Sequence, residues 1–429
     1  MFLNVLSLGA VADGVTDNTA CLQGLLDSLE PEGGTLFFPA GRYLTGSLVL
    51  HSHTTVHLEA GAVLCASTDH DLYPVVGEDM IPGYVRGTRR AILFSYGCEN
   101  LTVCGEGTIE GNGSAWWNSG ESDEMRPRTI QFIGCRNIRI RDIRIQNSPC
   151  WTVHPIRSEN ITVDGITICN PENSANTDGI NPESCKNVRI SNCCIDVGDD
   201  CITIKSGLER DLYQKAAPCE NIVVTNCTFV HGHGGVVIGS EMSGGVRNIT
   251  ITNCICQETN IGIRIKTRRR RGGIVEDILV SNVIFDNVIS GITANEYYCC
   301  GANRNDTELF TNEPRPVDAG TPAIRNVQIS GVMMKNVRGC GIFFYGIPES
   351  PVENVRINAV DIRAVGDTHG YYAVSCVKLD GSNGDGIYLK NVSRIRINDC
   401  TLNAKRHPLI LDGGLHDVTL NGERLDKEA

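Results

Sequence analysis

The sequence predicts an all-β protein, a single-stranded right-handed parallel β-helix (a solenoid) with a short N-terminal capping helix. The main observation is a phrase that recurs along the 429 residues: an Asn or Asp, then alternating β-branched residues, then a turn residue. Alternation in short runs is typical of strands, and there is almost no helical periodicity between the copies. Successive copies between Asn137 and Asp277 lie 23, 27, 34, 27 and 29 residues apart, which indicates a solenoid rather than a sandwich. The copies are NLTVCG at Asn100, NIRIRDI at Asn137, NITVDGI at Asn160, NVRISNC at Asn187, NIVVTNC at Asn221, NITITNC at Asn248, DILVSNV at Asp277, NVQISGV at Asn326, NVRINAV at Asn354 and DVTLNG at Asp417.

Two recurring residues indicate how neighbouring coils stack: the Asn that opens each phrase and the Cys that follow the strands. Parallel coils lie about 4.8 Å apart, so identical side chains at one repeat position can bond along the axis. We therefore expect an asparagine ladder at the corner of the coils. The Cys of NCCI, NCTF, NCIC and NDCT share one repeat position, so we expect a partial cysteine stack inside.

One segment, TDNTACLQGLLDSLE at residues 16–30, reads as an amphipathic helix with Thr16 or Asp17 as its N-cap. An open β-helix end invites edge-to-edge aggregation, so we place this helix over the N-terminal end. No linker-like composition appears, and we expect one catalytic domain over residues 1–429, with about 1–70 forming the cap and first coils. The apolar face of the helix consists of Cys21, Leu22, Leu25, Leu26 and Leu29.

Composition and charge exclude several classes of protein. An apolar content of 41% with 21% charged residues describes an ordinary folded protein, and no stretch approaches the length of a membrane span. The net charge of −12 argues against a nucleic-acid binder. The 20 Cys mostly lie in apolar strand contexts rather than in metal-ligand spacings, so we expect small buried hydrophobes.

The expected compartment follows from the start of the chain and from the Cys. The first residues, MFLNVLSLGAVADG, have neither a basic n-region nor a long apolar run, so they do not resemble a signal peptide. Together with Cys that show no disulfide framework, this favours a reducing, cytoplasmic location. A secreted protein whose leader had been trimmed would read the same way.

Four short motifs lie about one coil apart. NTD ends at Asp178, GDD ends at Asp200, GHG is centred on His233 and RIK begins at Arg264, in steps of 22, 33 and 31 residues. Equivalent positions of adjacent coils line up on a solenoid. We therefore expect three acids, an imidazole and two cations, the second being Lys266, along one face. Such a set contains the acid and the base that proton transfer needs.

The pair Asp199 and Asp200 requires a bend in the backbone, because neighbours on a regular strand point to opposite faces. Gly198, directly before the pair, makes such a bend easy. Arg264 and Lys266 are two residues apart and project to the same side, which suits the clamping of a carboxylate.

Each motif alone has an ordinary structural explanation. A lone DD is usually a solvated turn, a His among glycines is usually structural, and RIK alone is the polar face of a strand. Three clustered acids also supply the oxygen ligands that Ca²⁺ takes. The imidazole and the two cations on the next coils would repel a metal, so we interpret the set as one active site that uses no metal and no cofactor.

The four motifs resemble the pattern of the polygalacturonase family of glycoside hydrolases (family 28, pectin-degrading), which is NTD, G-x-DD or GDD, GHG and RIK. All four occur in order, and the β-helical phrase covers most of the chain from about Asn100 onward. The stretch GAVADGVTDNTACLQ…GGTLFFPAGRYLTGSL resembles the opening coil of many pectin-active β-helices. The family pattern also has a tyrosine after RIK; EYYCC offers Tyr297 and Tyr298, and we prefer Tyr298.

The resemblance implies a role for each site residue. Asp199 would be the general acid that protonates the glycosidic oxygen, while Asp178 and Asp200 would hold and deprotonate the attacking water. His233 would tune the protonation of the acid. The cations of RIK would bind the galacturonate carboxylate. Inversion of this kind needs an acid and a base about 6.5–9.5 Å apart.

Three insertions bear on the mode of attack, because exo-enzymes block one end of the groove with loops. They span residues 68–90, 111–128 and 299–321. The phrases GNGSAWWN, RPRTIQF and SPCWTVHP resemble those of bacterial family members that trim chain ends. We therefore expect Arg128 and His154 to line the sugar-binding end. The expected reaction is inverting, exo-acting hydrolysis of α-1,4-galacturonosidic bonds in polygalacturonate or oligogalacturonides.

A run of arginines, TRRRRGG, follows RIK directly. An acidic protein that binds a polyacid must concentrate positive charge locally, so Arg268 to Arg271 would suit one edge of the cleft. The alternative, which is more usual for such runs, is a solvated loop.

Three other functions fit the same pattern less well. The scaffold suits a hydrolase of rhamnogalacturonan or xylogalacturonan, a pectate lyase that uses Ca²⁺, or a non-catalytic carbohydrate-binding β-helix. The expected partner is an acidic oligo- or polysaccharide, with neither nucleic acid nor membrane. The sequence leaves the oligomeric state and the preferred substrate length open.

Overall fold

The chain folds as a right-handed parallel β-helix, as predicted, and divides into two compact units, Met1–Asp200 and Cys201–Ala429. The computed structural model describes residues 1–76, 88–117, 119–120, 125–209, 216–299, 301–303, 305–366 and 383–425. Each unit is described by itself, and the expectation of a single domain stays a prediction. Among the described residues, no helix has the length and apolar character needed to cross a membrane.

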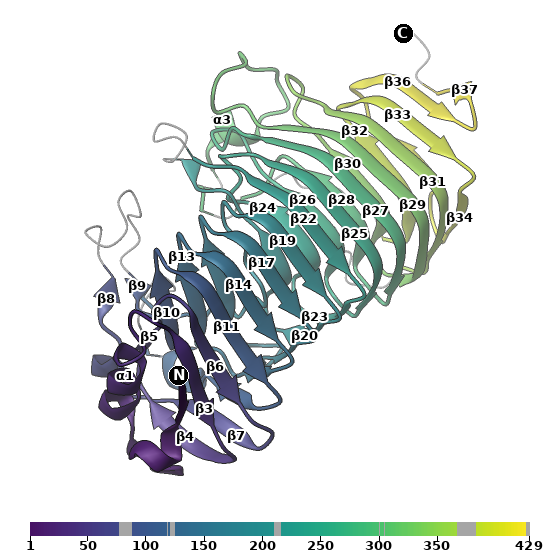
Figure 1. Ribbon diagram of the computed structural model, residues 1–429. Coiled ribbons are helices and arrows are strands. Elements are labelled where there is room, and N and C mark those ends of the chain that lie inside the picture. Colours follow the sequence, from purple (N-terminus) through teal and green to yellow (C-terminus); the bar gives the residue numbers. More distant parts are fainter. Residues whose placement is uncertain are drawn as a thin grey trace. The chain divides into compact units, whose positions relative to one another are not determined.

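The first unit stacks short parallel strands coil upon coil, and β6, β11, β14, β17 and β19 lie side by side in Figure 1. A four-stranded sheet forms a second face in the order β16-β13-β10-β5, and β8 and β9 form an antiparallel pair. The strands of the long sheet are β1 (Phe2–Asn4), β2 (Asp13–Asp17), β3 (Gly34–Phe38), β4 (Gly41–Thr45), β6 (Thr54–Leu58), β7 (Ala62–Ala66), β11 (Glu99–Gly105), β12 (Thr108–Glu110), β14 (Arg136–Arg141), β15 (Arg144–Gln146), β17 (Glu159–Asp164), β18 (Thr167–Cys169), β19 (Lys186–Ser191) and β20 (Cys194–Val197). The other elements are η1 (Val5–Leu8), α1 (Thr19–Asp27), β5 (Leu48–Val49), η2 (His70–Leu72), β8 (Val75–Val76), β9 (Thr88–Arg89), β10 (Leu93–Tyr96), α2 (Ser114–Trp117), β13 (Ile130–Ile133) and β16 (Val153–Ile156).

The alternation seen in the sequence places aliphatic residues of each coil in the core. Leu101, Ile138, Ile161 and Val188 are register partners on successive strands, and all are buried. Each such side chain contributes about 1.5–3 kcal/mol when removed from water. Repeated stacking of this kind fixes the register, because a slip of one residue would turn the apolar set outward.

The predicted asparagine ladder is confirmed. In the first unit the amide Nδ2 of Asn137 donates to Oδ1 of Asn100 at 3.0 Å, Asn160 donates to Asn137 at 3.2 Å, and Asn187 donates to Asn160 at 3.1 Å. All four residues have φ between 55° and 58°, a left-handed conformation that Asn tolerates better than most residues. We call these four residues the asparagine ladder of the first unit.

The predicted capping helix is present as α1, although it begins later than expected. Thr16 and Asp17 belong to β2, and the carboxylate of Asp17 accepts the backbone N–H of Thr19 at 2.9 Å. From the helix, Gln23 bonds to both polar groups of Val49 on the edge strand β5, at 2.8 and 3.2 Å. Its side chain therefore satisfies backbone groups that an open edge would expose. Of the predicted apolar face, Leu22, Leu26 and Leu29 are buried, whereas Cys21 and Leu25 are half-buried.

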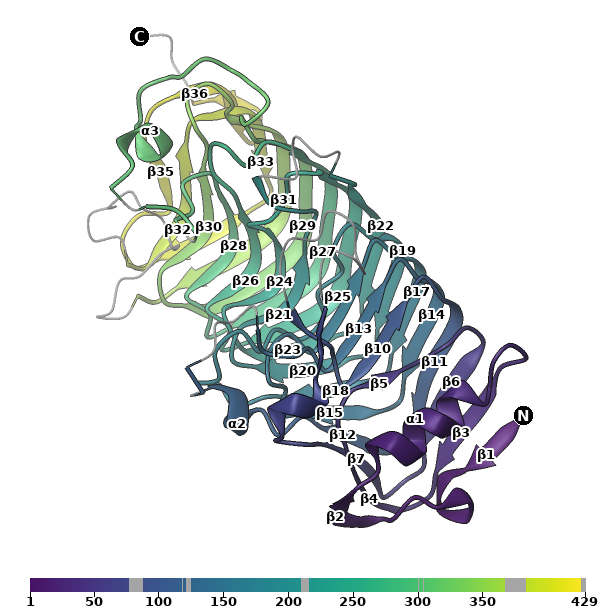
Figure 2. The same cartoon turned by 90° about the vertical axis from the view of Figure 1, so that its left-hand side faces the viewer.

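The second unit has two parallel sheets. One is seven-stranded in the order β21-β24-β26-β28-β30-β32-β35, whose later strands run side by side in Figure 2. Its strands are β21 (Asp200–Ile204, whose first residue closes the first unit), β24 (Gly234–Gly239), β26 (Ile261–Lys266), β28 (Ser290–Asn295), β30 (Cys340–Tyr345), β32 (Asp385–Lys390) and β35 (Leu409–Leu411). The remaining elements are β22 (Cys219–Thr225), β23 (Thr228–His231), β25 (Val246–Gln257), β27 (Ile274–Asp286), α3 (Thr307–Phe310), β29 (Ala323–Val337), β31 (Val352–Ala364), β33 (Val392–Asn398), β34 (Thr401–Ala404), β36 (Leu415–Leu420) and β37 (Glu423–Arg424).

The predicted cysteine stack is confirmed for one pair in the second unit. Cys227 and Cys254 are buried, and a hydrogen bond between the two thiols, together with burial, raises the pKa of Cys254. Cys193, at the same repeat position in the first unit, is also buried. Cys400 differs because it lies near the chain end and is only half-buried. All described cysteines are free thiols.

Candidate active site

The predicted bend before Asp200 is confirmed. Strand β20 ends at Val197, residues 198 and 199 form a bend, and β21 begins at Asp200. Gly198 is required there for a steric reason, since a Cβ on it would lie 2.3 Å from the carbonyl oxygen of Ser174 and 2.6 Å from that of Pro171. The bend frees Asp199 and Asp200 from the opposite faces that a regular strand would give them.

The bend brings three acids together within the first unit, as predicted. One carboxylate oxygen from each of Asp178, Asp199 and Asp200 lies within 4.8 Å of the others. Asp178 and Asp200 are only 3% and 2% exposed, whereas Asp199 is half-buried. The backbone helps to hold the group, because the N–H of Gly179 donates to the carbonyl oxygen of Asp200 at 3.0 Å.

A fourth polar residue in this cluster, Asn181, has no counterpart in the sequence-based prediction. Its side chain is fully buried, and its amide Nδ2 donates to Oδ2 of Asp178 at 2.8 Å. Its other polar atom, Oδ1, has no hydrogen-bond partner among the described residues. A buried amide that orients an acid and leaves an acceptor open suits a ligand that donates a hydrogen bond. The signal was present in the sequence, since NTDGIN contains this residue three positions after Asp178.

The spacing of the three carboxylates permits acid–base chemistry. A carboxyl that donates a proton and a carboxylate that accepts one can both act on a bond held between them. The separation between the closest oxygens is shorter than the expected 6.5–9.5 Å between the carboxyl groups of inverting enzymes. Three oxygens at this distance are also a partial ligand set for a hard cation, although Ca²⁺ takes six to eight.

The second unit carries the predicted cation pair on β26. Arg264 and Lys266 are 4% and 7% exposed, and the ring of Tyr298 lies 5.1 Å from the guanidinium carbon of the first and 5.1 Å from Nζ of the second. The guanidinium nitrogen Nη2 of Arg264 has no hydrogen-bond partner among the described residues. A buried cation with an open donor is an arrangement that suits a carboxylate. Tyr297, the alternative tyrosine, is fully buried and donates to Oδ1 of Asn312 at 3.1 Å.

His233 is exposed and lies directly before β24, in the second unit. The register between β24 and β26 pairs Gly234 with Ile261 and Val237 with Arg264. His233 therefore lies four residues short of the position opposite Arg264. The 31 residues from His233 to Arg264 therefore lead to the neighbouring coil, but not to the equal position on that coil.

Arg128 and His154 are buried in the first unit. Nη1 of Arg128 donates to the hydroxyl of Thr88 at 3.0 Å, and the guanidinium lies 4.8 Å from the ring of Trp151. His154 is 0% exposed, and its Nε2 lies 3.0 Å from a carboxylate oxygen of Glu183. Both side chains are engaged by protein groups, and neither presents a surface to a sugar in this structure. A substrate contact for either residue stays a prediction.

Three of the four arginines that follow RIK are buried rather than solvated, whereas Arg270 is exposed. Their place at one edge of the cleft stays a prediction. Arg268, Arg269 and Arg271 are 3%, 7% and 4% exposed. Arg268 pairs with Glu209 at 2.9 Å, and Arg270 pairs with Asp306 at 3.0 Å. The physical reason is that acids 36 to 80 residues away in sequence satisfy these cations, which no local pattern reveals.

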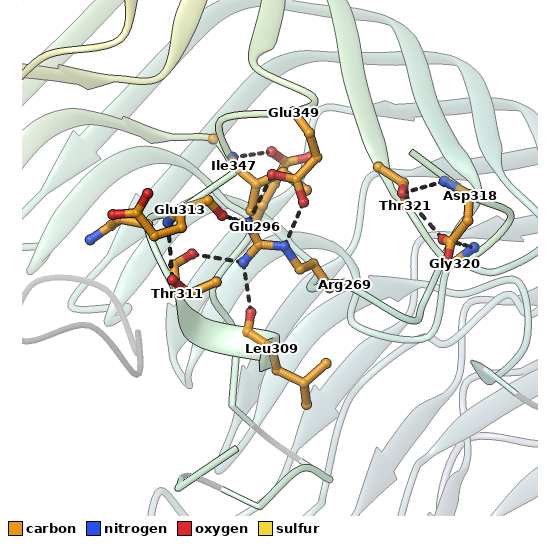
Figure 3. A network of polar contacts seen from close by, with 12 residues as sticks. Arg269, Glu296, Leu309, Thr311, Glu313, Asp318, Gly320, Thr321, Ile347 and Glu349 are labelled. Carbon is orange, nitrogen blue, oxygen red and sulfur yellow. Dashed lines mark hydrogen bonds and ion pairs between the residues drawn. The ribbon is translucent and has the colours of Figure 1, made fainter. Parts of the chain in front are cut away.

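Arg269 holds two loops of the second unit together (Figure 3). Its guanidinium forms two bonds with the carboxylate of Glu349, at 2.5 and 2.8 Å. It also donates to the carbonyl oxygens of Leu309 and Thr311 at 3.1 and 2.8 Å. Burial alone would raise the pKa of Glu349, but the hydrogen bonds and charge of Arg269 together with backbone hydrogen bonds lower that pKa. The segment around α3 is therefore fixed to the body of the unit.

Comparisons with known proteins agree with this arrangement. The model of glycosyl hydrolases family 28 matches residues 39–340. A "Probable polygalacturonase" of Vitis vinifera is 35% identical over 375 residues, which cover 84% of this chain and 74% of that protein. An "Exo-poly-alpha-D-galacturonosidase" of Dickeya chrysanthemi is 28% identical, over 67% of this chain and 55% of that protein.

Among solved structures, an exopolygalacturonase from Thermotoga maritima matches with a TM-score of 0.70 and 26% identity, covering 99% of this chain and 93% of that chain. The exopolygalacturonase of Yersinia enterocolitica matches with a TM-score of 0.77 over 99% of this chain and 79% of that chain; at 20% identity this likeness concerns the fold. The family model spans the residues that carry the three acids, His233 and the cation pair. The chain therefore belongs to glycosyl hydrolases family 28.

Proposed function

We propose that the protein hydrolyses α-1,4-galacturonosidic bonds in polygalacturonate or oligogalacturonides, releasing products from chain ends with inversion. The observation that carries the proposal is the convergence of Asp178, Asp199 and Asp200 within 4.8 Å. Asp199, the most accessible of the three, protonates the glycosidic oxygen. Asp178 and Asp200, both buried, hold the attacking water and accept its proton.

The sugar acid is recognised by the cation pair in the second unit. The open Nη2 of Arg264 and the ammonium of Lys266 bind the carboxylate of one galacturonate residue. Tyr298, whose ring lies against both cations, packs against the same sugar. The one-coil spacing of the motifs supports the view that the two groups act on the same substrate. His233 modulates the protonation of Asp199.

Exo action is supported by what covers the sheet beyond the cation pair. The row that begins at Arg264 continues on β28, β30 and β32 with Thr293, Phe343 and Tyr388. Phe343 and Tyr388 are buried in an aromatic cluster against which Phe310 of α3 packs. A sugar chain that followed the sheet past the cations would meet this cover, which Arg269 anchors. Of the other two expected loops, residues 77–87, 118 and 121–124 lie outside the described residues.

Product analysis on oligogalacturonides of defined length tests the proposal. Exo action predicts one short product from the first minutes onward, whereas a ladder of intermediate lengths would contradict it. Rhamnogalacturonan and xylogalacturonan serve as alternative substrates, and faster cleavage of either would replace galacturonan in the proposal. Proton NMR of the first product decides the stereochemistry, since inversion of an α-linkage gives the β-anomer first.

A further inference from the structure

The outer face of the first unit carries a polar groove of about 350 Å³ away from the acid cluster. It runs across β11, β14, β17 and β19, between the asparagine ladder and a row of Thr102, Arg139, Thr162 and Arg189. The register confirms that the row is continuous, because these four residues are partners on successive strands. None of the three acids lies on these strands, which face the reader in Figure 1.

The two arginines of the groove, Arg139 on β14 and Arg189 on β19, differ from the other arginines of β14. Arg136 pairs with Glu159 at 3.8 Å, and Arg141 pairs with Asp142 at 3.5 Å. Arg139 and Arg189 are exposed and have no ion pair with any acid in the described part of the chain. They lie two strands apart, so their backbones are about 10 Å from each other. Two open guanidinium groups at a fixed separation suit two carboxylates of one polymer.

The rest of the groove supplies donors for hydroxyl and carboxylate oxygens. Asn137 and Asn160, which line the groove, each use one N–H for the preceding ladder residue, and an amide has two. Thr162 adds a hydroxyl group between the two arginines, and Thr102 adds another on the other side of Arg139. The equivalent face of the second unit has a groove of about 480 Å³ that also contains amides and one arginine, Arg356, but is lined in addition by Ile249, Leu279 and Asp277. The groove of the first unit therefore differs in having two arginines and no acid or aliphatic side chain in its lining.

We propose that this groove is a second carbohydrate-binding site that holds a carboxylated glycan strand, a non-reacting segment of galacturonan. The inference rests on the proposed function for the identity of the glycan. Charge complementarity supports this occupant, since an acidic protein of net charge −12 repels polyanions elsewhere and must hold them at local cationic sites. A bound segment keeps the polymer near the enzyme between cleavage events.

The test uses affinity electrophoresis through polygalacturonate and calorimetric titration with the same polymer. The full chain carries Asp199→Asn, so that the polymer stays intact during the measurement. Arg139→Gln with Arg189→Gln should weaken binding of the polymer about tenfold, because the double variant loses two charge-assisted contacts to substrate carboxylates. The matched control, Arg136→Gln with Arg141→Gln, removes the same charge and should change binding less than about twofold.

Two results would overturn the site: polygalacturonate binding that is not weakened in the groove variant, or binding that is weakened equally in the control. Equal retention of the protein by dextran sulfate or DNA would also overturn it, because the groove would then be a general polyanion surface. In the active enzyme, the groove variant should keep the wild-type rate on trigalacturonate but lose rate on the polymer. If wild-type protein fails to hydrolyse galacturonan yet binds it through the groove, the proposed function fails and the groove stands. If it hydrolyses galacturonan and the groove variant behaves as wild type on polymer, the groove alone fails.

Discussion

The amide of Asn181 donates a 2.8 Å hydrogen bond to Oδ2 of Asp178, and both side chains are buried. This contact fixes the orientation of a carboxylate that, in the proposed mechanism, holds the attacking water. A misplacement of about 1 Å at such a position costs roughly 10²-fold in rate. Asn181 is therefore a positioning residue whose effect should fall on turnover.

Asn181→Ala should lower kcat about 10²-fold on a defined oligogalacturonide while KM changes little, because the substrate carboxylate is bound elsewhere. Asn181→Asp should in addition shift the pH profile, since it adds a carboxyl beside Asp178. Asn173→Ala, which removes an exposed Asn from the turn shortly before Asp178, is the control. If Asn181→Ala lowers the melting temperature but leaves kcat and the pH profile unchanged, its role is structural only.

Arg264→Lys tests whether the guanidinium fork, rather than positive charge alone, binds the sugar acid. Lys keeps the charge but cannot offer the open Nη2 donor. We expect kcat/KM on oligogalacturonides to fall more than about tenfold, mainly through KM. Initial-rate measurements check this. The control is Arg270→Lys, which changes an arginine of an exposed surface ion pair. An unchanged KM in Arg264→Lys would remove this residue from substrate binding.

Glu296 gives the stability of the second unit a predictable dependence on pH. Burial raises its pKa well above 4.5, although the N–H of Ile347 donates to Oε2 at 2.8 Å and opposes the shift. The folded state therefore keeps a proton that the unfolded chain releases, so stability falls as pH rises from about 4.5 through the folded pKa. Glu296→Gln keeps the acceptor and removes the ionisation.

The melting temperature of Glu296→Gln relative to wild type should therefore increase between about pH 5 and pH 8. Thermal unfolding followed by circular dichroism at both values measures it. A difference that stays constant, or that shrinks toward pH 8, would show that Glu296 is not held protonated in the folded protein.

Chelation separates hydrolysis from the lyase alternative. A Ca²⁺-dependent elimination would stop in excess EDTA and would leave an unsaturated sugar that absorbs in the ultraviolet. Hydrolysis by the three acids predicts undiminished release of reducing ends in EDTA and no such absorbance. Loss of activity that Ca²⁺ restores would assign the acid cluster to a metal.

The sequence predicts those parts of the fold that repeat and those parts of the site that are local. The features that could be predicted act within one coil or between adjacent coils, so the sequence shows their positions directly. They are the alternation of the strands, the ladder Asn and Gly198. The acids converge because one bend in the backbone suffices. Asn181 could have been noticed, but a single amide in a strand context carries no distinctive spacing.

The arginine run shows why other parts could not be predicted. Arg269 is satisfied by Glu349, 80 residues away, and by carbonyl groups of a loop whose path the sequence does not reveal. Burial of His154 depends likewise on Glu183, 29 residues away. Partners that meet only through the winding of the chain leave no local pattern, and residue type alone then favours solvent or substrate as the partner.

The release of reducing ends from a defined oligogalacturonide by Asp199→Asn, compared with wild type, tests the central claim most directly. Removal of the general acid should lower the rate by about 10²–10⁴-fold while the melting temperature stays near that of wild type. A folded Asp199→Asn protein that works within tenfold of the wild-type rate would contradict the assignment of this acid cluster as the catalytic centre.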